Sequence, residues 1–337
     1  MYCRERAPGK NFHSSRTSAM RIVVTGSSGF VGKALVNRLA ADPSIEVVAG
    51  SRVPSTWSKP NVKSFVHGDL TSRPDLREVL SGAHAVIHLA ARVHVMRDKA
   101  VEPAAEFRLA NVNATEWLAE TAVHTGVRRF IYVSSIKVNG ESTPLLRPFR
   151  AEDPPRPIDP YGISKWEAED TLHRIAAATG LEVVIVRPPL VYGPGVGANF
   201  RSMMNWLVRG VPLPFGAIHN QRSLVAVENL CDLLLACAQH PDAAGHTFLA
   251  GDGESVSTTQ LLRRLGRALG RPARLIPVPS AALQLAFEMV GKGEVGRRLC
   301  SSLEVDIAKT LDILGWRPGL TLDDGLERTA RSFLAGP

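Results

Sequence analysis

Short apolar runs alternate with amphipathic segments through the first two-thirds of this 337-residue chain. The alternation is typical of β-α-β units, in which helices cover both faces of a parallel sheet. The expected strands are Arg21–Thr25, Glu46–Ala49, Val62–Val66, Ala85–Leu89, Phe130–Val133 and Val183–Arg187. The expected helices include Gly32–Ala41, Pro103–Thr125 and Tyr161–Thr179. The pattern therefore predicts an α/β fold with a doubly wound parallel sheet.

The alternation is lost after Pro194, where shorter helices and Pro-rich loops follow. We expect a main domain at residues 20–194 and a smaller mixed α/β lobe at residues 195–337 that binds substrate. One later strand, Thr247–Ala250, could rejoin the main sheet. Pro-rich loops are expected at Pro144–Pro160 and Pro188–Pro194. The second follows a strand directly, at the edge where open α/β sheets bind ligands.

Composition excludes several classes of protein. Apolar residues make up 45% and charged residues 21%, as in an ordinary globular protein and unlike a disordered or collagenous chain. The four cysteines form no C-x-x-C pair and His residues do not cluster, so we expect free thiols in a reducing cytoplasm, no disulfide framework and no metal site. No apolar stretch is long enough to span a bilayer, and no membrane partner is expected.

The chain is basic, with 40 Lys and Arg against 32 Asp and Glu and a net charge of +8. Residues 1–19 hold four basic residues against one Glu, without an apolar segment, and carry +3 of this charge. We interpret them as a disordered extension, with an organelle transit peptide as the alternative. The remaining basic residues are dispersed without interleaved aromatics, which argues against nucleic acid and favours a phosphorylated small molecule.

A glycine turn joins the first strand to the first helix. Gly26, Gly29 and Gly32 stand in Arg21-Ile-Val-Val-Thr-Gly-Ser-Ser-Gly-Phe-Val-Gly32. Glycine lets the backbone turn tightly and approach a pyrophosphate, while the N-terminus of the helix directs N–H groups at it. The strand before and the helix after this turn predict a dinucleotide site in a Rossmann-type domain.

Together with Thr25, the G-x-x-G-x-x-G spacing resembles the extended short-chain dehydrogenases/reductases of the NAD-dependent epimerase/dehydratase family. The resemblance implies cofactor contacts from the turn, from His67-Gly-Asp-Leu70, from the end of the fourth strand and from the wall beside the nicotinamide. These residues are Gly26, Ser28, Gly29, Phe30, Val31, Gly32, Asp69, Leu70, Leu89, Ala90, Ala91 and Pro188. Asp69 could instead be a turn residue or a helix cap.

The end of the second strand bears on the choice between NAD and NADP. An Asp or Glu there binds the ribose of NAD, whereas an Arg accommodates the extra phosphate of NADP. Here the chain reads Val48-Ala-Gly-Ser-Arg52 without a carboxylate. We therefore expect NAD or NADP, with NADP slightly favoured, although Arg52 could be a solvated surface charge.

Tyr161 and Lys165 lie four residues apart at the start of an expected helix, so they share one face. A phenol with a pKa of about 10 needs a nearby positive charge to act as a base at neutral pH. In the family resemblance, Ser135 is the catalytic serine that bonds the reacting sugar oxygen. Lys165 also holds the nicotinamide ribose, and Asn111 holds a water near the lysine. Tyr161 exchanges the proton of the substrate.

The C-terminal part resembles members of the family that bind nucleotide sugars. The resemblance implies that Arg222 and, more weakly, Arg298 bind a diphosphate, for which a guanidinium is suited. It places Asn199 at the start of a helix facing the nucleotide and Pro214 with Phe215 beside the uracil. His94 could touch the substrate. Each could instead be an ordinary surface residue, but their order along the chain favours a UDP-linked sugar.

Departures from the family pattern limit the reaction. 4,6-Dehydratases carry an Asp-Glu pair where this chain has Ile136 and Lys137, which disfavours dehydration. Leu190 and Val93 replace residues of UDP-galactose 4-epimerases. The resemblance is to a subgroup of UDP-N-acetylquinovosamine 4-ketoreductases and UDP-glucose 4-epimerase-like proteins. Because of Ser51 and Arg52, we narrowly favour reduction of a UDP-4-keto-6-deoxy-N-acetylhexosamine.

Other functions stay open. The first alternative is a 4-epimerase of UDP-glucose or UDP-N-acetylglucosamine, which returns the hydride to the same sugar. An NADP-dependent reductase of an apolar alcohol would not need Arg222 and Asn199, and an NAD(P)-sensing regulator would characteristically lack the Tyr161 and Lys165 pair. The family resemblance also implies a homodimer through a four-helix interface made by Pro103–Thr125 and Tyr161–Thr179.

Overall fold

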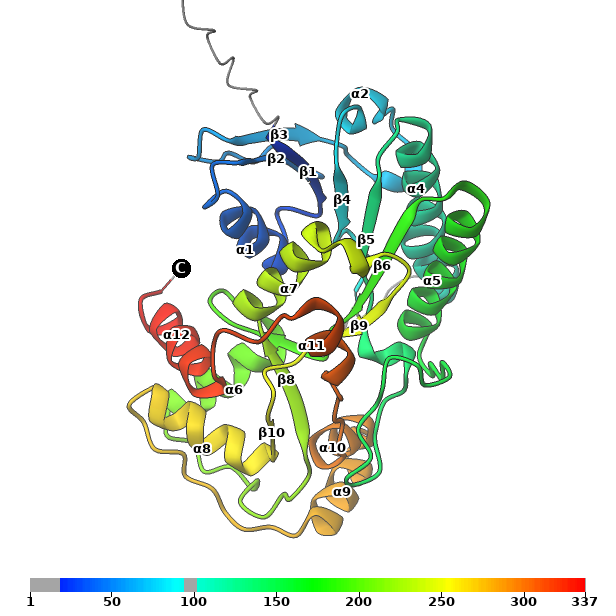
Figure 1. Cartoon of the computed structure of the whole chain (residues 1–337). Helices are drawn as coiled ribbons and strands as arrows, with labels where there is room; N and C mark the ends of the chain where they lie inside the picture. Colours follow the sequence, from blue (N-terminus) through cyan, green and yellow to red (C-terminus); the bar gives the residue numbers. More distant parts are fainter. Residues whose placement is uncertain (1–18, 94–101, 337) are drawn as a thin grey trace, which may run out of the picture.

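A parallel sheet of seven strands forms the centre of the protein in a computed structural model that describes residues 19–93 and 102–336 (Figure 1). The strand order is β3-β2-β1-β4-β5-β6-β9, and every neighbouring pair is parallel. The strands are β1 (Met20–Thr25), β2 (Ile45–Ser51), β3 (Val62–Val66), β4 (Ala85–His88), β5 (Arg129–Val133), β6 (Glu182–Arg187) and β9 (Thr247–Leu249). This confirms the predicted doubly wound α/β fold.

Alternate residues of the strands are buried on opposite faces of the sheet. Ile22 and Val24 of β1 pack with α1 (Phe30–Leu39) and α7 (Val227–Gln239). Val23 instead packs with the helices of the other face. These are α2 (Arg77–Leu80), α4 (Ala114–His124) and α5 (Pro160–Thr179). Because both faces are covered, the central strands are largely apolar along their length, whereas the edge strand β3 is partly exposed.

The predicted helix at Pro103–Thr125 is divided by one π-helical turn. It consists of α3 (Pro103–Arg108), the π turn Leu109–Asn113 and α4. Such turns occur mostly within α-helices and are frequent at functional sites. The second long helix, α5, has Asp159 as its N-cap, Pro160 in its first turn and Gly180 in the left-handed conformation at its end. These are strong start and stop signals.

The C-terminal lobe lies below the carboxyl edge of the sheet in Figure 1 and has its own apolar core. A small sheet in the order β10-β8-β7 is formed by β7 (Leu190–Tyr192), β8 (Arg222–Ala226) and β10 (Ser255–Val256). Its helices are α6 (Ala198–Val208), α8 (Thr258–Ala268), α9 (Ser280–Met289), α10 (Gly293–Cys300) and α12 (Leu322–Leu334), whereas α11 (Ala308–Leu314) packs against the core of the main sheet beside β9. No helix within the described residues is long and apolar enough to cross a membrane.

Two details of the lobe differ from, or extend, the sequence expectations. The segment predicted as the loop Pro188–Pro194 contains β7, because Leu190–Tyr192 pairs in parallel with Leu224–Ala226 of β8. The late strand β9 rejoins the main sheet beside β6, as the sequence allowed. Since the chain returns to the first unit after building part of the second, the division at residue 194 stays a prediction.

A buried ion pair connects β6 to α5. Arg187 at the end of β6 donates from Nε and Nη2 to the carboxylate of Glu169, with the shortest distance 2.6 Å. Its Nη1 donates to Oδ1 of Asn139 at 2.9 Å, and all three side chains are buried. Such a pair holds two elements in one arrangement, because any shift leaves a charge desolvated without its partner.

We predict that Glu169→Ala lowers the free energy of unfolding by about 3–5 kcal/mol, because the Arg187 guanidinium stays buried without its counter-ion. The matched control is Asp170→Ala, which removes an exposed pair with Arg174 on the same helix and should cost no more than about 1 kcal/mol. Urea unfolding measures both losses. Small and equal losses would contradict a supporting role for the buried pair.

Candidate active site

The glycine turn begins where β1 ends and is built around two close backbone approaches. Gly26 has φ +72°, and a Cβ there would lie 2.7 Å from the backbone nitrogen of Ala90 after β4. A Cβ on Gly32 would lie 2.1 Å from the carbonyl oxygen of Gly26, so α1 can begin at Phe30 with Gly29 as its N-cap. The turn therefore presents the N-terminus of α1 at the carboxyl edge of the sheet.

The other predicted cofactor residues surround this turn. Ser28 and Gly29 are exposed, whereas Phe30 and Val31 are partly buried in the first turn of α1. Leu89 follows β4 and donates its N–H to the carbonyl of Thr25, which brings Leu89, Ala90 and Ala91 beside Gly26.

Asp69 and Arg52 stand at the ends of β3 and β2. Asp69 accepts from the N–H of Thr71 at 2.9 Å and thus caps a short 3-10 turn that contains the buried Leu70. Asp69 therefore has the helix-cap role that the sequence analysis gave as the alternative to cofactor binding. Hydrogen bonds from Thr71 are the main cause that lowers the pKa of Asp69, and Arg52 also contributes. Arg52 is exposed beside this carboxylate, so the structure offers a cationic group at the end of β2.

The residues around the turn fit a dinucleotide. The space that side chains would fill at Gly26 and Gly32 is left to backbone, and a pyrophosphate can approach N–H groups there. The hydroxyls of Ser27 and Ser134 are buried and have no hydrogen-bond partner within the described residues. An NAD(P) molecule would supply polar atoms on this edge, where the turn of residues 26–32 would hold its phosphates and Lys165 its nicotinamide ribose.

The structure brings Ser135, Tyr161 and Lys165 together. Ser135 follows β5, and its side chain lies close enough to the Tyr161 hydroxyl to lower the pKa of that phenol. The N–H of Ile136 donates to the carbonyl of Pro188 at 3.0 Å, which places the end of β6 beside the serine. One turn along α5, Lys165 is 2% exposed, with Nζ 4.2 Å from the ring centroid of Tyr132. The predicted trio therefore forms one site.

Burial opposes the charged form of both catalytic candidates. It raises the pKa of Tyr161 to about 12, with a smaller contribution from the Asp159 carboxylate and an opposing one from Ser135. Burial also lowers the pKa of Lys165 to about 7, and the nearby Glu169 carboxylate opposes this shift. The tyrosine is thus a proton donor by default, and it needs an added positive charge to become a base.

Asn111 has two tasks in the π turn. Its side chain accepts from the N–H of Arg92 at 2.7 Å and donates to the carbonyl of Arg92 and to Oγ of Ser164 at 3.0 Å each. Ser164 in turn donates to the carbonyl of Tyr161 at 2.8 Å. Asn111 therefore connects the segment after β4 to the first turn of α5, directly beside Lys165.

His88 continues this buried network under the site. Its ring bonds Thr25 at 2.6 Å and Thr115 at 3.0 Å, and Thr115 donates to the carbonyl of Asn111 at 2.7 Å. Burial, followed by Lys165, lowers the pKa of His88 to about 3. A neutral ring that bridges two threonines acts as a structural connector.

A cavity of about 570 Å³ opens beside Tyr161. Phe107 of α3 lies on one side, with its ring centroid 6.1 Å from that of Tyr161, and Arg298 and Arg297 of α10 lie on another. The remaining lining residues are Pro103, Glu141, Ser142, Ile158, Asp159, Pro160, Glu294 and Ser301. This volume is in the range of small-molecule sites.

Of the two predicted arginines, Arg298 lines this cavity, and Arg222 lies next to it without being among the lining residues. Arg222 at the start of β8 donates to the carbonyl of Arg298 at 2.8 Å and to that of Ser301 at 3.2 Å. Burial, and then the charge of Arg298, lower the pKa of Arg222. Two guanidinium groups held near one another favour an anion between or beside them.

The other predicted substrate residues are not among those that line the cavity. Asn199 is exposed in the first turn of α6, and Pro214 is partly buried. Phe215 packs in the core of the lobe, while its carbonyl accepts from Thr259 at 2.6 Å. His94 lies outside the described residues. The roles of these four residues stay predictions.

Sequence reasoning missed a cluster of charged side chains next to Tyr161. Lys137 contacts the Asp159 carboxylate, and its Nζ lies 3.1 Å from Oε1 of Glu141. Asp159 also caps α5 through the N–H of Gly162 at 2.7 Å. The sequence contains a signal for Asp159, because Asp159-Pro160 is a typical helix start. Phe107 and Arg297 carried no comparable signal, because only tertiary packing brings them to Tyr161.

Comparisons with known proteins agree with this geometry. The model of the NAD dependent epimerase/dehydratase family matches residues 22–251. A protein of Vibrio cholerae named UDP-glucose 4-epimerase is 45% identical over 314 residues, which cover 93% of this chain and 95% of that protein. A protein of the same name from Mycolicibacterium smegmatis is 29% identical and covers 93% of this chain and 98% of its own length.

Solved structures of this fold are also similar. MoeE5 in complex with UDP-glucuronic acid and NAD has a TM-score of 0.76 and 26% identity, covering 94% of this chain and 100% of that one. The UDP-N-acetylglucosamine 4-epimerase of Methanobrevibacter ruminantium has a TM-score of 0.77 at 20% identity, covering 95% and 100%, and it supports the fold alone. The family model and the 45% identical relative, with which the glycine turn agrees, show that the chain belongs to the NAD dependent epimerase/dehydratase family of extended short-chain dehydrogenases/reductases.

Proposed function

We propose that this protein catalyses NAD(P)-dependent oxidoreduction at C4 of a UDP-linked sugar and that the outcome is epimerisation. The observation that carries the proposal is the grouping of Ser135 and Lys165 around Tyr161, which lines a cavity that Arg298 also lines. The sequence at Ser51–Arg52 favours net reduction, whereas the 45% identity to a UDP-glucose 4-epimerase over nearly the whole chain favours epimerisation.

The chain's own residues would work as follows. Ser135 bonds the sugar oxygen at C4 and aligns it with the Tyr161 hydroxyl, which exchanges the proton of that oxygen. When Lys165 is protonated, its positive charge stabilises the phenolate form of Tyr161. Burial lowers the pKa of Lys165 to about 7. The nicotinamide cofactor supplies the hydride acceptor and donor. Phe107 and Pro103 exclude water from one side of the cavity.

The nucleotide half of the substrate would extend toward α10 and β8. Arg298 and Arg222 would bind the diphosphate, with Asn199, Pro214, Phe215 and His94 as further candidates. We assign no dehydratase role, because Ile136 is buried and Lys137 is paired with two carboxylates where that reaction needs an acid and a base. A homodimer through the faces of α4 and α5 remains part of the proposal.

The proposal is tested by incubating the protein with UDP-glucose and with UDP-N-acetylglucosamine and following the sugar by NMR. We expect interconversion of the C4 epimers without net change in the cofactor. Tyr161→Phe should lower kcat/KM by about 10²–10⁴, the usual contribution of a general acid or base, while cofactor binding is retained. Unchanged turnover in this variant would overturn the catalytic assignment.

A second candidate is a 4-ketoreductase, which Arg52 at the end of β2 favours. In that case one NADPH is consumed for each UDP-4-keto-6-deoxy sugar that is reduced. UDP-glucose and UDP-N-acetylglucosamine are then not converted to their C4 epimers. If Arg52 binds the 2′-phosphate, Arg52→Ala should weaken NADPH binding by about tenfold or more and leave NADH binding nearly unchanged. Arg77→Ala, at another exposed arginine, is the control. Equal losses for both cofactors would remove Arg52 as a phosphate ligand.

The Lys137 cluster predicts a shift in the pH profile. The Asp159 carboxylate raises the pKa of Tyr161, and Lys137 offsets that charge. Lys137→Met should therefore raise the pKa of Tyr161 further and move the acid limb of kcat/KM toward higher pH by roughly half a unit to one unit. Lys63→Met, which breaks a distant pair with Glu46, should leave the profile in place. A shift toward lower pH would contradict this electrostatic account.

A further inference from the structure

Lys165 is buried without a counter-ion of its own. It is 2% exposed, and its Nζ donates no hydrogen bond and forms no salt bridge within residues 19–93 and 102–336. Glu169, one turn further along α5, already pairs with Arg187 at 2.6 Å. Removing an ammonium from water without a partner is costly. The charge of Lys165 in the free protein therefore depends on another neighbour.

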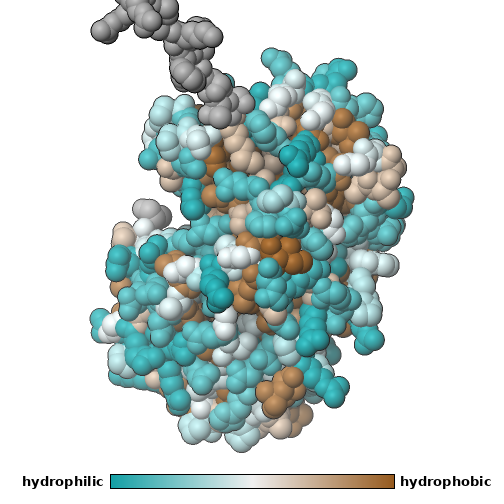
Figure 2. All heavy atoms as spheres, viewed as in Figure 1, coloured by the Kyte–Doolittle hydropathy of each residue, from teal (hydrophilic) through white to brown (hydrophobic). Residues whose placement is uncertain are grey.

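The ring of Tyr132 is that neighbour. Nζ of Lys165 lies over the ring, 4.2 Å from its centroid, and Tyr132 is 1% exposed. A cation within about 6 Å of an aromatic face is attracted by the negative charge of the π system, and more strongly where water is excluded. The ring belongs to the apolar cluster between the sheet and helices α4 and α5, inside a molecule whose visible face in Figure 2 is largely hydrophilic. Water therefore screens this contact little.

The register of the sheet fixes this ring. Tyr132 of β5 lies beside His88 of β4, which in turn lies beside Thr25 of β1. The centroids of the His88 and Tyr132 rings are 5.8 Å apart, and their planes differ by 26°. Both nitrogens of His88 are hydrogen-bonded, one to Thr25 and the other to Thr115. Since its neighbour is held on both sides, the Tyr132 ring has little freedom to move away from Lys165.

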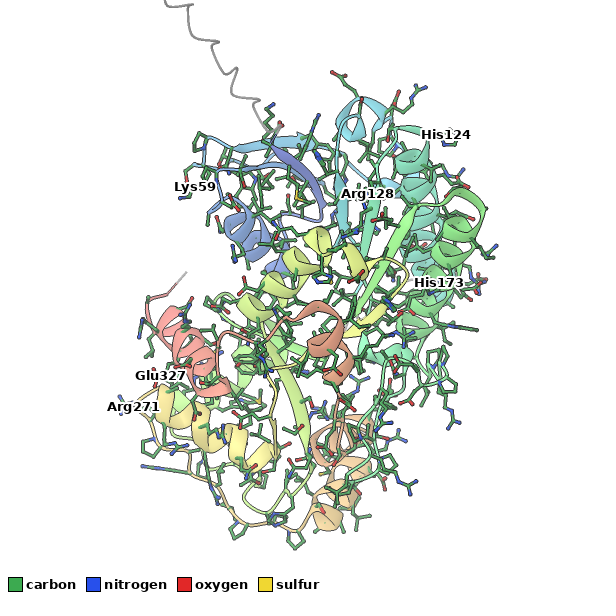
Figure 3. The ribbon with its side chains drawn as sticks, viewed as in Figure 1. Lys59, His124, Arg128, His173, Arg271 and Glu327 are labelled. Carbon is green, nitrogen blue, oxygen red and sulfur yellow. The ribbon has the colours of Figure 1, made fainter. Side chains whose placement is uncertain are left out.

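The titratable side chains near the lysine do not replace this contact. Burial lowers the pKa of His88 to about 3, so its ring is neutral. Burial also raises the pKa of Tyr132 well above its usual range and that of Tyr161 to about 12. The exposed His124 and His173 lie on the outer sides of α4 and α5, away from the sheet (Figure 3). Tyr132 therefore acts as a neutral ring, through its π face.

Charged side chains on the elements packed against α5 have other contacts. The ion pairs are Lys137 with Asp159, Arg108 with Glu167 and Arg174 with Asp170. Arg92, after β4, lies 5.5 Å from the ring centroid of Phe107. Glu116 of α4 lines a surface groove between α4 and α5, and the π turn holds no charged residue. The ring of Tyr132 is thus the contact that the described part of the chain offers to the ammonium of Lys165.

We propose that Tyr132 is a positioning residue for Lys165: the face of its ring binds the ammonium, keeps it charged and holds it one helical turn from Tyr161. This role rests on the proposed function, because a charged lysine there stabilises the phenolate of the catalytic tyrosine. Strand β5 thus contributes the ring and is followed directly by the segment of Ser135. Tyr132 itself exchanges no proton with the substrate.

Titration of Lys165 in the full-length protein tests the contact without substrate. Lysine is isotope-labelled at its ε carbon and followed by NMR, and the resonance missing from Lys165→Arg identifies it. Tyr132→Leu removes the aromatic face and keeps an apolar side chain, so the ratio of ammonium to amine at a given pH should fall about tenfold. Tyr132→Phe keeps the face and should stay within about threefold of the wild type.

Two results of this titration would overturn the proposal. One is an equal ratio of ammonium to amine in the wild type and in Tyr132→Leu. The other is a fall in Tyr132→Phe as large as that in Tyr132→Leu, which would assign the effect to the hydroxyl.

Phe130 offers a matched control on the same strand. It lies two residues before Tyr132, is fully buried in the same apolar cluster, and has its ring centroid 5.9 Å from that of His88. Phe130→Leu therefore removes a comparable ring without removing the contact with Lys165. It should leave the titration of Lys165 in place, while urea unfolding shows a loss of stability similar to that of Tyr132→Leu. An equal change of the titration in both variants would assign the effect to lost packing and refute the proposal.

A fluorinated ring tests the charge of the face without creating a cavity. Pentafluorophenylalanine at position 132 has nearly the shape of the ring in Tyr132→Phe, but its fluorines withdraw the negative charge from the face that attracts a cation. The ratio of ammonium to amine at Lys165 should be about tenfold or more lower with the fluorinated ring than with Phe. This comparison holds even where Tyr132→Leu does not fold. Equal ratios for the two rings would reject the cation–π contact.

Turnover of UDP-sugars measures the consequence for catalysis. Above the pKa of Lys165 of about 7, Tyr132→Leu should lower kcat/KM about tenfold, because fewer molecules hold the ammonium. The deficit should shrink as the pH falls, since the lysine is then protonated in both proteins. A merely structural defect would lower kcat/KM by one factor at every pH, and that result would contradict the proposal. If Lys165 titrates as expected but the wild type turns over no UDP-sugar, the proposed function fails while the contact stands.

Discussion

The buried contact between Arg187 and Glu169 is the constraint on which the candidate site most depends. It joins the end of β6 to the middle of α5, one helical turn beyond Lys165. The same guanidinium bonds Asn139, which follows the segment of Ser135. One residue therefore orders the three parts of the chain that carry the catalytic trio. Hydrogen bonds to Glu169 and Asn139 offset the free-energy cost of removing the Arg187 guanidinium from water.

The same burial that orders the site works against its chemistry. Withdrawing Tyr161 and Lys165 from water raises the pKa of the phenol to about 12 and lowers that of the ammonium to about 7. Both shifts favour neutral groups, whereas a phenolate beside an ammonium is the state that can accept a proton. A site of this kind rests in its neutral form until a bound charge changes the local field. Glu169 opposes the shift on Lys165, so the ion pair that orders the helix also tunes it.

The sequence predicted those parts of the site that depend on local backbone chemistry. The glycine turn was readable because Gly26 and Gly32 leave room that no side chain could occupy. Tyr161 and Lys165 were readable because their spacing requires a helix, and Asp159-Pro160 begins it. The main strands were found to within one or two residues, since parallel strands buried on both faces are apolar throughout.

Features that depend on distant contacts were not readable. The π turn at Asn111 interrupts a segment whose composition favours a regular helix. It allows the Asn111 side chain to hydrogen-bond Arg92 and Ser164, which are distant in the sequence. Strand β7 forms in a segment predicted as a loop because β8, more than thirty residues later, supplies its partner. The cavity lies between α3, the start of α5 and α10, and the spacing of residues along the chain does not predict that these elements come together.

Charge distribution gives the last connection between sequence and function. The excess of basic residues first indicated an anionic partner without identifying it, and the fold divides that excess among separate places. Lys165 is buried beside Tyr161, Arg298 lines the cavity with Arg222 next to it, and five arginines lie on and after α8, from Arg263 to Arg274. Because Gly296 of α10 packs closely on Phe287 of α9, the position of α9 also sets the position of the wall that holds Arg298.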